Sequence, residues 1–164
     1  MYFVLFTINL HKSKARMNQL INIRNILFIG IVFMLFSCNR NNLHPVPYLQ
    51  FDLNLNLNLP AYQPLQGVGG YAHVTGAGSK GVIVYRRSSN EFVAFDRHSP
   101  ADPEGTCPSG LVNDDDNFLV LNDPCSEAQF SLFDGSIYSG DVEWGLRSYL
   151  THFNGGDFLR VYNP

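Results

Sequence analysis

A strict two-residue alternation of apolar and polar side chains runs through residues 51–59 and limits the folds open to this chain. The segment reads Phe-Asp-Leu-Asn-Leu-Asn-Leu-Asn-Leu and stops at Pro60. Successive side chains of a β-strand point to opposite faces, so the pattern predicts a strand with one buried face. A Leu-Asn repeat is also a low-complexity pattern, which leaves a second interpretation open. After residue 38, no window of eleven or more residues has the 3.6-residue period of a helix.

Shorter strand-like segments follow, each bounded by turn residues. They are expected at residues 71–74, 81–86, 91–95, 117–121, 129–133, 136–139, 146–153 and 157–162. Asp134-Gly135 and Asn154-Gly155-Gly156 are strong hairpin signals between the last four. The chain has 164 residues, of which 45% are hydrophobic, enough for one packed domain. The fold class expected over residues 50–164 is therefore all-β, a small antiparallel sandwich or barrel.

A basic, apolar segment precedes this acidic body. Residues 1–37 contain four Lys and Arg residues and no acid, whereas the remaining residues contain seven basic and fourteen acidic ones. Residues 26–36 carry no charge, and their length is short for a membrane span and typical of a signal peptide. Met17 begins a complete signal peptide of ordinary length, which favours Met17 over Met1 as the translation start. The net charge of −3 argues against a nucleic-acid-binding surface.

The apolar segment ends in Leu35-Phe36-Ser37-Cys38, where a small residue directly precedes a cysteine. This motif resembles a bacterial lipobox, which implies that Cys38 is diacylated and becomes the first residue of the mature protein. A plain signal anchor with an incidental cysteine is the alternative. Residues 38–49 are polar and then broken by prolines, as in a tether that separates a domain from a membrane. The expected location is the cell envelope, with a lipid anchor in the periplasm-facing leaflet of the inner or outer membrane.

Two irregular segments interrupt the strands. Residues 96–109 contain three prolines and Cys107, and residues 122–128 contain Cys125. Each segment follows an expected strand. Long irregular loops on a β scaffold are where functional sites are usually built. We therefore expect any functional site to lie in these two loops.

The order of elements over residues 68–162 resembles a Rieske domain. The resemblance lies in Phe92–Pro100, Phe118–Ser126, Phe130–Ser136, Ser139-Gly140 and Leu146–Tyr149. Rieske domains place a Cys-x-His loop after one strand and a Cys-x-x-His loop after a later strand. The chain also resembles short Rieske-like lipoproteins of the Bacteroidetes kind, which share the lipobox and the proline-rich tether. The resemblance implies a 2Fe–2S centre held by two thiolates and two imidazoles.

The sequence departs from that pattern at all four ligand positions. In the register of the motif these positions are Ser99, Ala101, Asp123 and Ser126. Moving the register onto Cys107 or Cys125 places Ser109 or Ala128 where a histidine is required. Neither serine nor alanine replaces thiolate or imidazole at iron. We therefore expect no cofactor and no other metal, with a bound 2Fe–2S cluster as the alternative.

The resemblance also implies a disulfide, because many Rieske proteins carry an extra cysteine in each cluster loop. Cys125 directly precedes Ser126, the histidine position of the second loop. The position before that histidine is where the extra second-loop cysteine of the family lies. Cys107 lies a few residues later than the family spacing, so a small insertion is assumed. Export to an oxidising compartment favours pairing. Closing a loop of roughly 19 residues contributes about 3 kcal/mol, and two free buried thiols are the alternative.

Other candidate sites have weaker patterns. Asp114-Asp115-Asp116 does not match the spacing of a calcium loop and is expected to be a solvated turn. His98 is interpreted as a single surface histidine in a loop, neither a base nor a ligand. No Ser–His–Asp arrangement is supported around Ser99 or Ser126, so no catalytic residue is assigned and an enzyme is not expected. Trp144 is expected in the core or under a loop.

Three functions remain open at this point. The first is a membrane-anchored lipoprotein whose Rieske-like domain has lost its cluster and acts as a binding or accessory module, with an envelope protein as candidate partner. The second is a Rieske electron-transfer protein, an oxidoreductase component. The third is an unrelated β-sandwich envelope lipoprotein. A pair of β loops that converge at one tip favours the first two over the third.

Overall fold

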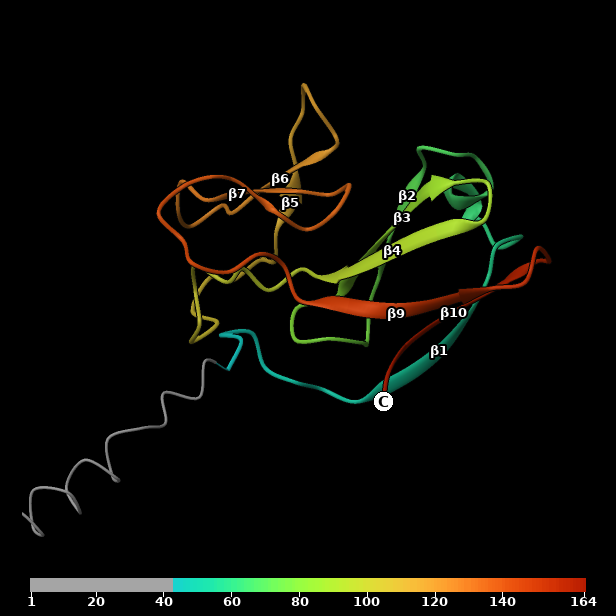
Figure 1. Ribbon diagram of the computed structural model, residues 1–164, viewed down its shortest axis with the longest axis horizontal. Helices are drawn as coiled ribbons and strands as arrows, with labels where there is room; N and C mark the ends of the chain where they lie inside the picture. Colours follow the sequence, from blue (N-terminus) through green and yellow to red (C-terminus); the bar gives the residue numbers. More distant parts are fainter. Residues whose placement is uncertain (1–42) are drawn as a thin grey trace, which may run out of the picture. The chain divides into compact units, whose positions relative to one another are not determined.

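The computed structural model describes residues 43–164, which form two antiparallel sheets without an α-helix (Figure 1). The strands are β1 (Phe51–Asn56), β2 (Tyr71–Val74), β3 (Val82–Ser88), β4 (Glu91–Asp96), β5 (Val112–Asn113), β6 (Val120–Asn122), β7 (Gln129–Ser131), β8 (Ile137–Ser139), β9 (Ser148–Phe153) and β10 (Phe158–Asn163). A 3-10 turn, η1 (Gln63–Gln66), lies between β1 and β2. The expectation of a small antiparallel all-β domain is confirmed.

The N-terminal expectations lie outside the described residues. They comprise the signal peptide over residues 1–37, the start at Met17 and the acylation of Cys38. Within residues 43–164, no helix is long and apolar enough to cross a membrane.

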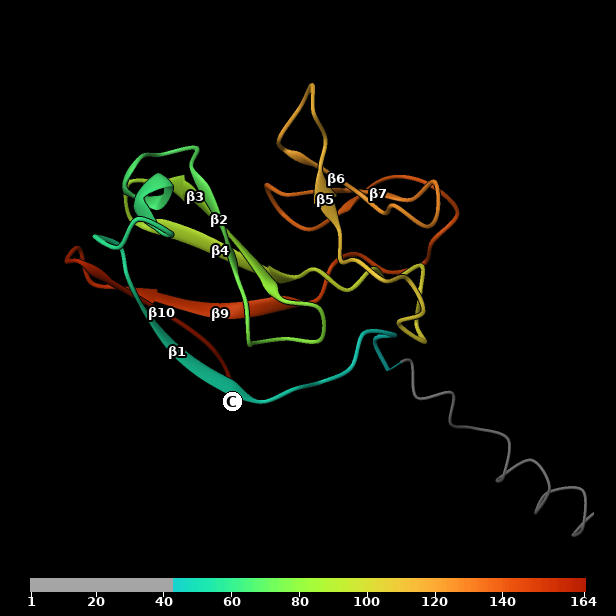
Figure 2. The same cartoon turned by 180° about the vertical axis from the view of Figure 1, so that it is seen from behind.

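The larger sheet has six strands in the order β1-β10-β9-β4-β3-β2 and curves into half a barrel (Figures 1 and 2). Its two three-stranded halves meet where β4 pairs with β9 over only two residue pairs, Ala94 with Tyr149 and Phe95 with Ser148. The concave side holds one core cluster that includes Leu55, Val84 and Leu159. The expected alternation of β1 therefore places its leucines on the buried face.

The smaller sheet, in the order β5-β6-β7-β8, packs beside β3 and β4 through a second core cluster. Val82 and Val84 of β3 belong to the first cluster, whereas Ile83 and Tyr85 belong to the second. β3 is thus buried on both faces, which explains its continuous run of apolar residues. The first irregular loop connects β4 of the larger sheet to β5 of the smaller one, and the second connects β6 to β7 within the smaller sheet.

Both predicted hairpin turns are present. Asp134-Gly135 connects β7 to β8, and Asn154–Gly156 connects β9 to β10. Gly135 has a φ of +77°, and a Cβ there would lie 2.6 Å from the Phe95 ring. Any other residue at this turn would therefore clash with the second core cluster.

Some strand ends differ from the expected ranges, and polar side chains explain the difference. β1 ends at Asn56 instead of Leu59, because the Asn56 side chain accepts a hydrogen bond from the Asn58 N–H and starts a turn. β6 begins at Val120 instead of Asn117, because Asn117 accepts from the Leu119 N–H in the same way. β5, a strand of two residues, is too short to be recognised in the sequence.

The part of the expected tether that the structure describes lies against the domain. Val46 has none of its surface exposed. His44 Nε2 lies 3.0 Å from the Gly145 carbonyl oxygen, and Arg147 Nε donates to the Val46 carbonyl at 2.9 Å. Residues 43–46, which were expected to belong to the tether, therefore pack with the domain, because these long-range contacts bury a proline-flanked valine.

Candidate functional site

The first irregular loop leaves β4 at Asp96, a fully buried carboxylate that four donors surround. Oδ2 accepts from the Ser79 N–H and the Tyr149 hydroxyl, both at 2.6 Å. Oδ1 accepts from the N–H groups of Lys80 at 3.2 Å and His98 at 2.8 Å. Burial and the bond to Asp96 raise the pKa of Tyr149 well above its ordinary value. Asp96 therefore fastens the start of the loop to the β2–β3 connection and to β9.

His98 is buried, with 3% of its surface exposed, so the expectation of a surface histidine is wrong. Its Nε2 lies 2.7 Å from the Asp102 carbonyl oxygen, and its Nδ1 lies 2.7 Å from Ser79 Oγ. A carbonyl oxygen only accepts, so Nε2 is the donor in the bond to Asp102. Both ring nitrogens are therefore engaged within the domain, and His98 supports the first loop.

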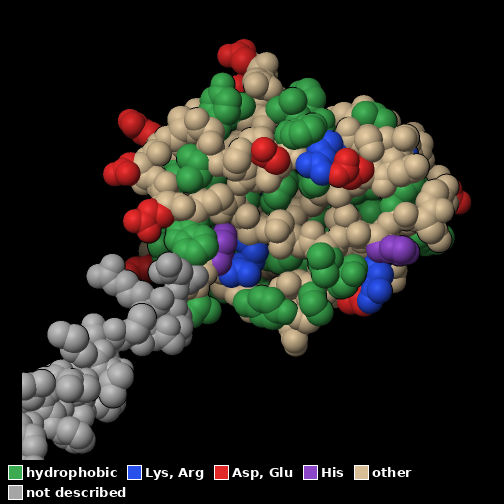
Figure 3. All heavy atoms as spheres, in the orientation of Figure 1, with side chains coloured by type: hydrophobic (Ala, Val, Ile, Leu, Met, Phe, Trp, Pro, Cys, Tyr) green, Lys and Arg blue, Asp and Glu red, His purple; other side chains and the backbone are tan. Residues whose placement is uncertain are grey.

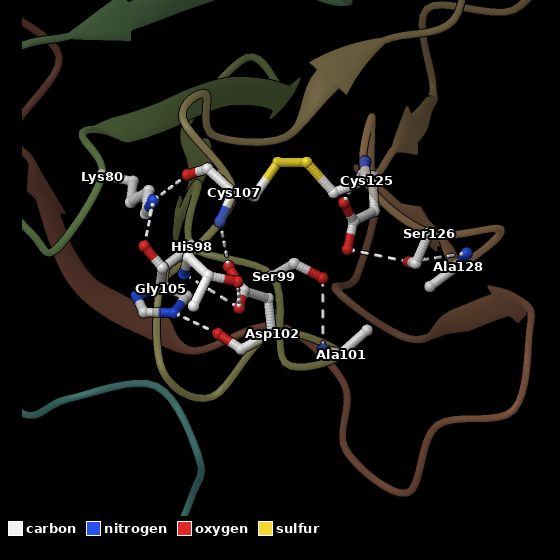
Figure 4. Close-up of a disulfide and its surroundings, with 12 residues drawn as sticks. Lys80, His98, Ser99, Ala101, Asp102, Gly105, Cys107, Cys125, Ser126 and Ala128 are labelled. Atoms are coloured by element: carbon white, nitrogen blue, oxygen red, sulfur yellow. Dashed lines mark hydrogen bonds between the residues drawn. A yellow bond between two sulfur atoms is a disulfide. The ribbon is translucent and has the colours of Figure 1, made fainter.

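Lys80 and Asp102 shape the rest of the first loop (Figure 4). Lys80 Nζ donates to the carbonyl of Gly105 at 2.8 Å and to that of Cys107. The Asp102 carboxylate accepts from the Cys107 N–H at 2.8 Å and from the N–H and hydroxyl of Thr106 at 3.0 and 2.8 Å. These bonds, the one from Cys107 first, lower the pKa of Asp102. The segment that carries Cys107 is thus held from both sides.

The second loop lies between β6 and β7 and folds around Asp123. The buried Asp123 carboxylate accepts from the Cys125 N–H and the Ser126 hydroxyl, both at 2.9 Å. The Ser126 hydroxyl oxygen accepts from the Ala128 N–H at 3.2 Å. Side chains that bond to the backbone two residues ahead are typical of tight polar turns. Asp123 and Ser126 therefore serve the conformation of their own loop.

A disulfide joins the two loops through Cys107 and Cys125, the pair expected from the sequence. The Cα atoms lie 5.8 Å apart and the sequence separation is 18 residues. This distance is within the range that a disulfide spans. The bridge brings the two irregular segments together at one tip of the domain, called the tip below (Figure 4).

The four positions that the resemblance assigns to cluster ligands all lie at the tip. Ser99 is buried and its Oγ accepts from the Ala101 N–H at 3.2 Å, while Ala101 has no donor atom. Asp123 and Ser126 are bonded to each other. Cys107, Asp123 and Cys125 have ligand atoms within 4.8 Å of one another, but both sulfurs are already joined. This donor set does not fit a 2Fe–2S centre, which needs two thiolates and two imidazoles.

A hollow of about 360 Å³ lies between the second loop and the segment after β8. Its lining consists of Ala101, Ser126, Glu127, Ala128, Gly140, Asp141 and Val142. Two of the four ligand positions, Ala101 and Ser126, thus face this space. Apolar side chains form most of the wall, and Glu127 and Asp141 add negative charge. The hollow was not predictable from the sequence, because residues 140–142 reach it only through the fold.

The tip is acidic. Residues 101–107, 124–128 and 140–147 contain five Asp and Glu residues and one arginine. Figure 3 shows acidic side chains along the edge of the domain that these loops form. A surface of this sign attracts cationic groups and repels nucleic acid.

Two further expectations have structural outcomes. Asp114 accepts from the N–H groups of Asp116 and Asn117 at 3.0 and 2.9 Å and from the Asn122 side chain at 2.9 Å, so the acidic run is a turn. Trp144 lies outside both core clusters. It is partly exposed and contacts the His44 ring edge-on, with centroids 5.4 Å apart.

The comparisons with known proteins give no relative for this arrangement. Protein-family models and curated proteins do not match the sequence, and no solved structure matches the fold.

Proposed function

We propose that this chain is an envelope lipoprotein whose Rieske-like domain holds no iron–sulfur cluster and acts as a binding or accessory module through its tip. In this proposal the mature protein begins at acylated Cys38. The observation that supports this proposal most directly is the set of side chains at the ligand positions. Ser99 and Asp123 are buried and hydrogen-bonded to groups of their own loops, and Ala101 has no atom that could bind a metal.

The architecture of the tip supports the Rieske-like interpretation. One irregular loop follows β4, the other follows β6, and a disulfide joins them as the family resemblance implies. The second loop leads into β7 with Phe130 and then into the turn at Gly135, in the order that the resemblance requires. In an unrelated β-sandwich, two such loops would lie together only by coincidence. These features therefore favour a Rieske-like domain over an unrelated β-sandwich.

The chemistry opposes electron transfer. Iron in a Rieske centre is held by side chains, and the surrounding hydrogen bonds only tune it. Here the hydroxyls and the carboxylate at these positions are already used within the loops. The hollow beside Ala101 and Ser126 instead offers an apolar, acidic surface of fixed shape, suited to a cationic group on a ligand or partner.

Iron content and visible absorption test this proposal. The mature protein, produced with export in an iron-replete host, is expected to be colourless and to hold far less than one iron per chain. Stoichiometric iron with visible absorption bands would establish the electron-transfer alternative and overturn the proposal.

A restored ligand set tests the Rieske-like geometry itself. The fourfold variant Ser99→Cys, Ala101→His, Asp123→Cys and Ser126→His is expected to bind iron and absorb visible light. Because Ser99 and Asp123 are buried, a second variant carries only Ala101→His and Ser126→His, whose side chains face the hollow. This pair is expected to bind Ni²⁺ more tightly than the unmodified protein. Folded variants of both kinds that gain no metal affinity would contradict the assignment.

A further inference from the structure

The N-terminal segment of the domain is fixed to one place on its surface. His44 and Val46 bond to Gly145 and Arg147 as described above, and the His44 Nδ1 accepts from the Val46 N–H at 3.2 Å. Trp144 packs on the His44 ring. The buried Val46 makes this attachment part of the domain. The chain therefore enters the domain at a defined point, beside residues 144–147.

The length of chain before this point limits how far the domain can lie from an acylated cysteine. Only residues 39–42 separate Cys38 from Leu43. Five Cα–Cα steps reach at most about 18 Å when fully extended. A flexible spacer that ended at residue 50 would have reached more than twice as far. The docking of residues 43–49 therefore removes most of the expected freedom.

We propose that the surface around Leu43, His44 and Trp144 faces the membrane and holds the tip end of the domain at the lipid headgroups. This inference rests on the proposed function, because it requires the acylation of Cys38. We refer to this surface as the membrane-proximal surface. Leu43 is 75% exposed and Trp144 is partly exposed, and side chains of these two kinds are well accommodated at a membrane interface.

The tether, and not charge, is what holds this surface to the membrane. Asp141 and Glu143 are exposed on the same segment as Trp144, and anionic headgroups would repel them. A short link to the acyl chains overcomes such repulsion by keeping the domain at high effective concentration near the bilayer. The domain without its lipid is therefore expected to stay free of neutral and anionic vesicles.

The orientation has a consequence for the hollow at the tip. Asp141 and Val142, which line it, lie within three residues of Trp144. The hollow is therefore within reach of a membrane-bound or membrane-adjacent partner. The turn between β9 and β10 lies at the opposite end of the domain from residues 43–46 in both views (Figures 1 and 2). That end points away from the bilayer.

Trp144 is the only tryptophan in the chain and provides a native probe of this orientation. The experiment measures energy transfer from tryptophan to a dansyl-labelled phosphatidylethanolamine in phosphatidylcholine vesicles that carry the acylated mature protein. A matched variant combines Trp144→Phe with Phe158→Trp and moves the donor to an exposed site near the β9–β10 turn. Strong transfer is expected from Trp144 and weak transfer from the relocated tryptophan.

A second variant lengthens the link. About thirty Gly and Ser residues inserted between Asn42 and Leu43 give an average reach of about 30 Å. This insertion is expected to remove most of the transfer from Trp144. Equal transfer from the two tryptophan positions, or transfer that the insertion does not change, would overturn the proposed orientation.

Mass spectrometry of the same protein separates the two proposals. An unmodified Cys38 and protein that does not float with vesicles would overturn both the lipoprotein assignment and the orientation. An acylated protein with equal transfer from both donor positions would overturn only the orientation. The variant Cys38→Ala, which cannot be acylated, is expected to show no transfer with any vesicle.

Discussion

Removing the hydroxyl of Tyr149 tests whether Asp96 fastens the tip to the six-stranded sheet. The hydroxyl donates to the fully buried Asp96 carboxylate at 2.6 Å. A hydrogen bond to a charged group contributes about 1.5–3 kcal/mol to stability. Tyr149→Phe keeps the ring and its edge-on contact with Phe51, and it leaves Asp96 three backbone donors. We therefore expect the free energy of unfolding to fall by about 2 kcal/mol.

Urea unfolding of the purified mature protein, followed by circular dichroism, measures this loss. Tyr138→Phe is the matched control, because Tyr138 is 63% exposed and its substitution is expected to change the free energy of unfolding by less than about 0.5 kcal/mol. A loss of less than about 0.5 kcal/mol for Tyr149→Phe would refute the role assigned to Asp96.

The pH dependence provides an independent readout of the same bond. The pKa of Tyr149 is raised in the folded protein, so its hydroxyl stays protonated where an unfolded tyrosine ionises. The advantage of tyrosine over phenylalanine is fully present below the ordinary pKa of about 10 and is expected to shrink as the pH rises above it. A stability difference that stays constant well above pH 10 would contradict this explanation.

Two further predictions concern the loops. Reduction of the Cys107–Cys125 bond, or replacement of both cysteines by alanine, is expected to lower the free energy of unfolding by about 3 kcal/mol. The circular dichroism spectrum should still be that of a β protein. Unfolding curves that match those of the oxidised protein would contradict this prediction. The lowered pKa of Asp102 means that its carboxylate stabilises the first loop above its ordinary pKa and that this stabilisation is lost as the pH falls through the lower, folded-state value. Asp102→Asn is therefore expected to lower the melting temperature at pH 7, and this difference from the unmodified protein should shrink below about pH 4. A difference that becomes larger in acid would contradict the prediction.

Local patterns in the sequence were sufficient to predict the class of fold. The alternation in β1 and the turns at Gly135 and Gly155 depend on the preferences of a few neighbouring residues, and the structure contains all three. The uninterrupted apolar run of β3 was recognisable as a strand, but its burial on two faces depends on the second sheet. Strand ends were less predictable, because side-chain bonds such as that of Asn56 decide where a strand stops.

The support of the tip was not predictable, because it depends on residues that are far apart in the sequence. Asp96 meets Tyr149 across 53 positions, and Lys80 meets Cys107 across 27. His98 is polar and lies in a loop, which favours exposure, yet two buried hydrogen bonds hold it inside. The docking of Val46 against Arg147 spans 101 positions and has no local signal. The cysteine pair was predictable because the resemblance implies a disulfide between the two loops and because export to an oxidising compartment favours pairing.

Covalent and hydrogen bonds within the chain connect and support the two loops of the tip. A metal centre in such a place would connect the two loops through four ligand bonds, and its loss would ordinarily leave them free to separate. Here the disulfide connects the loops covalently, Lys80 and Asp102 fix the first loop, and Asp123 fixes the second. Lys80, Asp102 and Asp123 also satisfy backbone groups of the loops that would otherwise be unpaired. Contacts within the chain thus fix the loops that form part of the wall of the hollow, and a fixed wall would lower the conformational entropy lost when a ligand binds there.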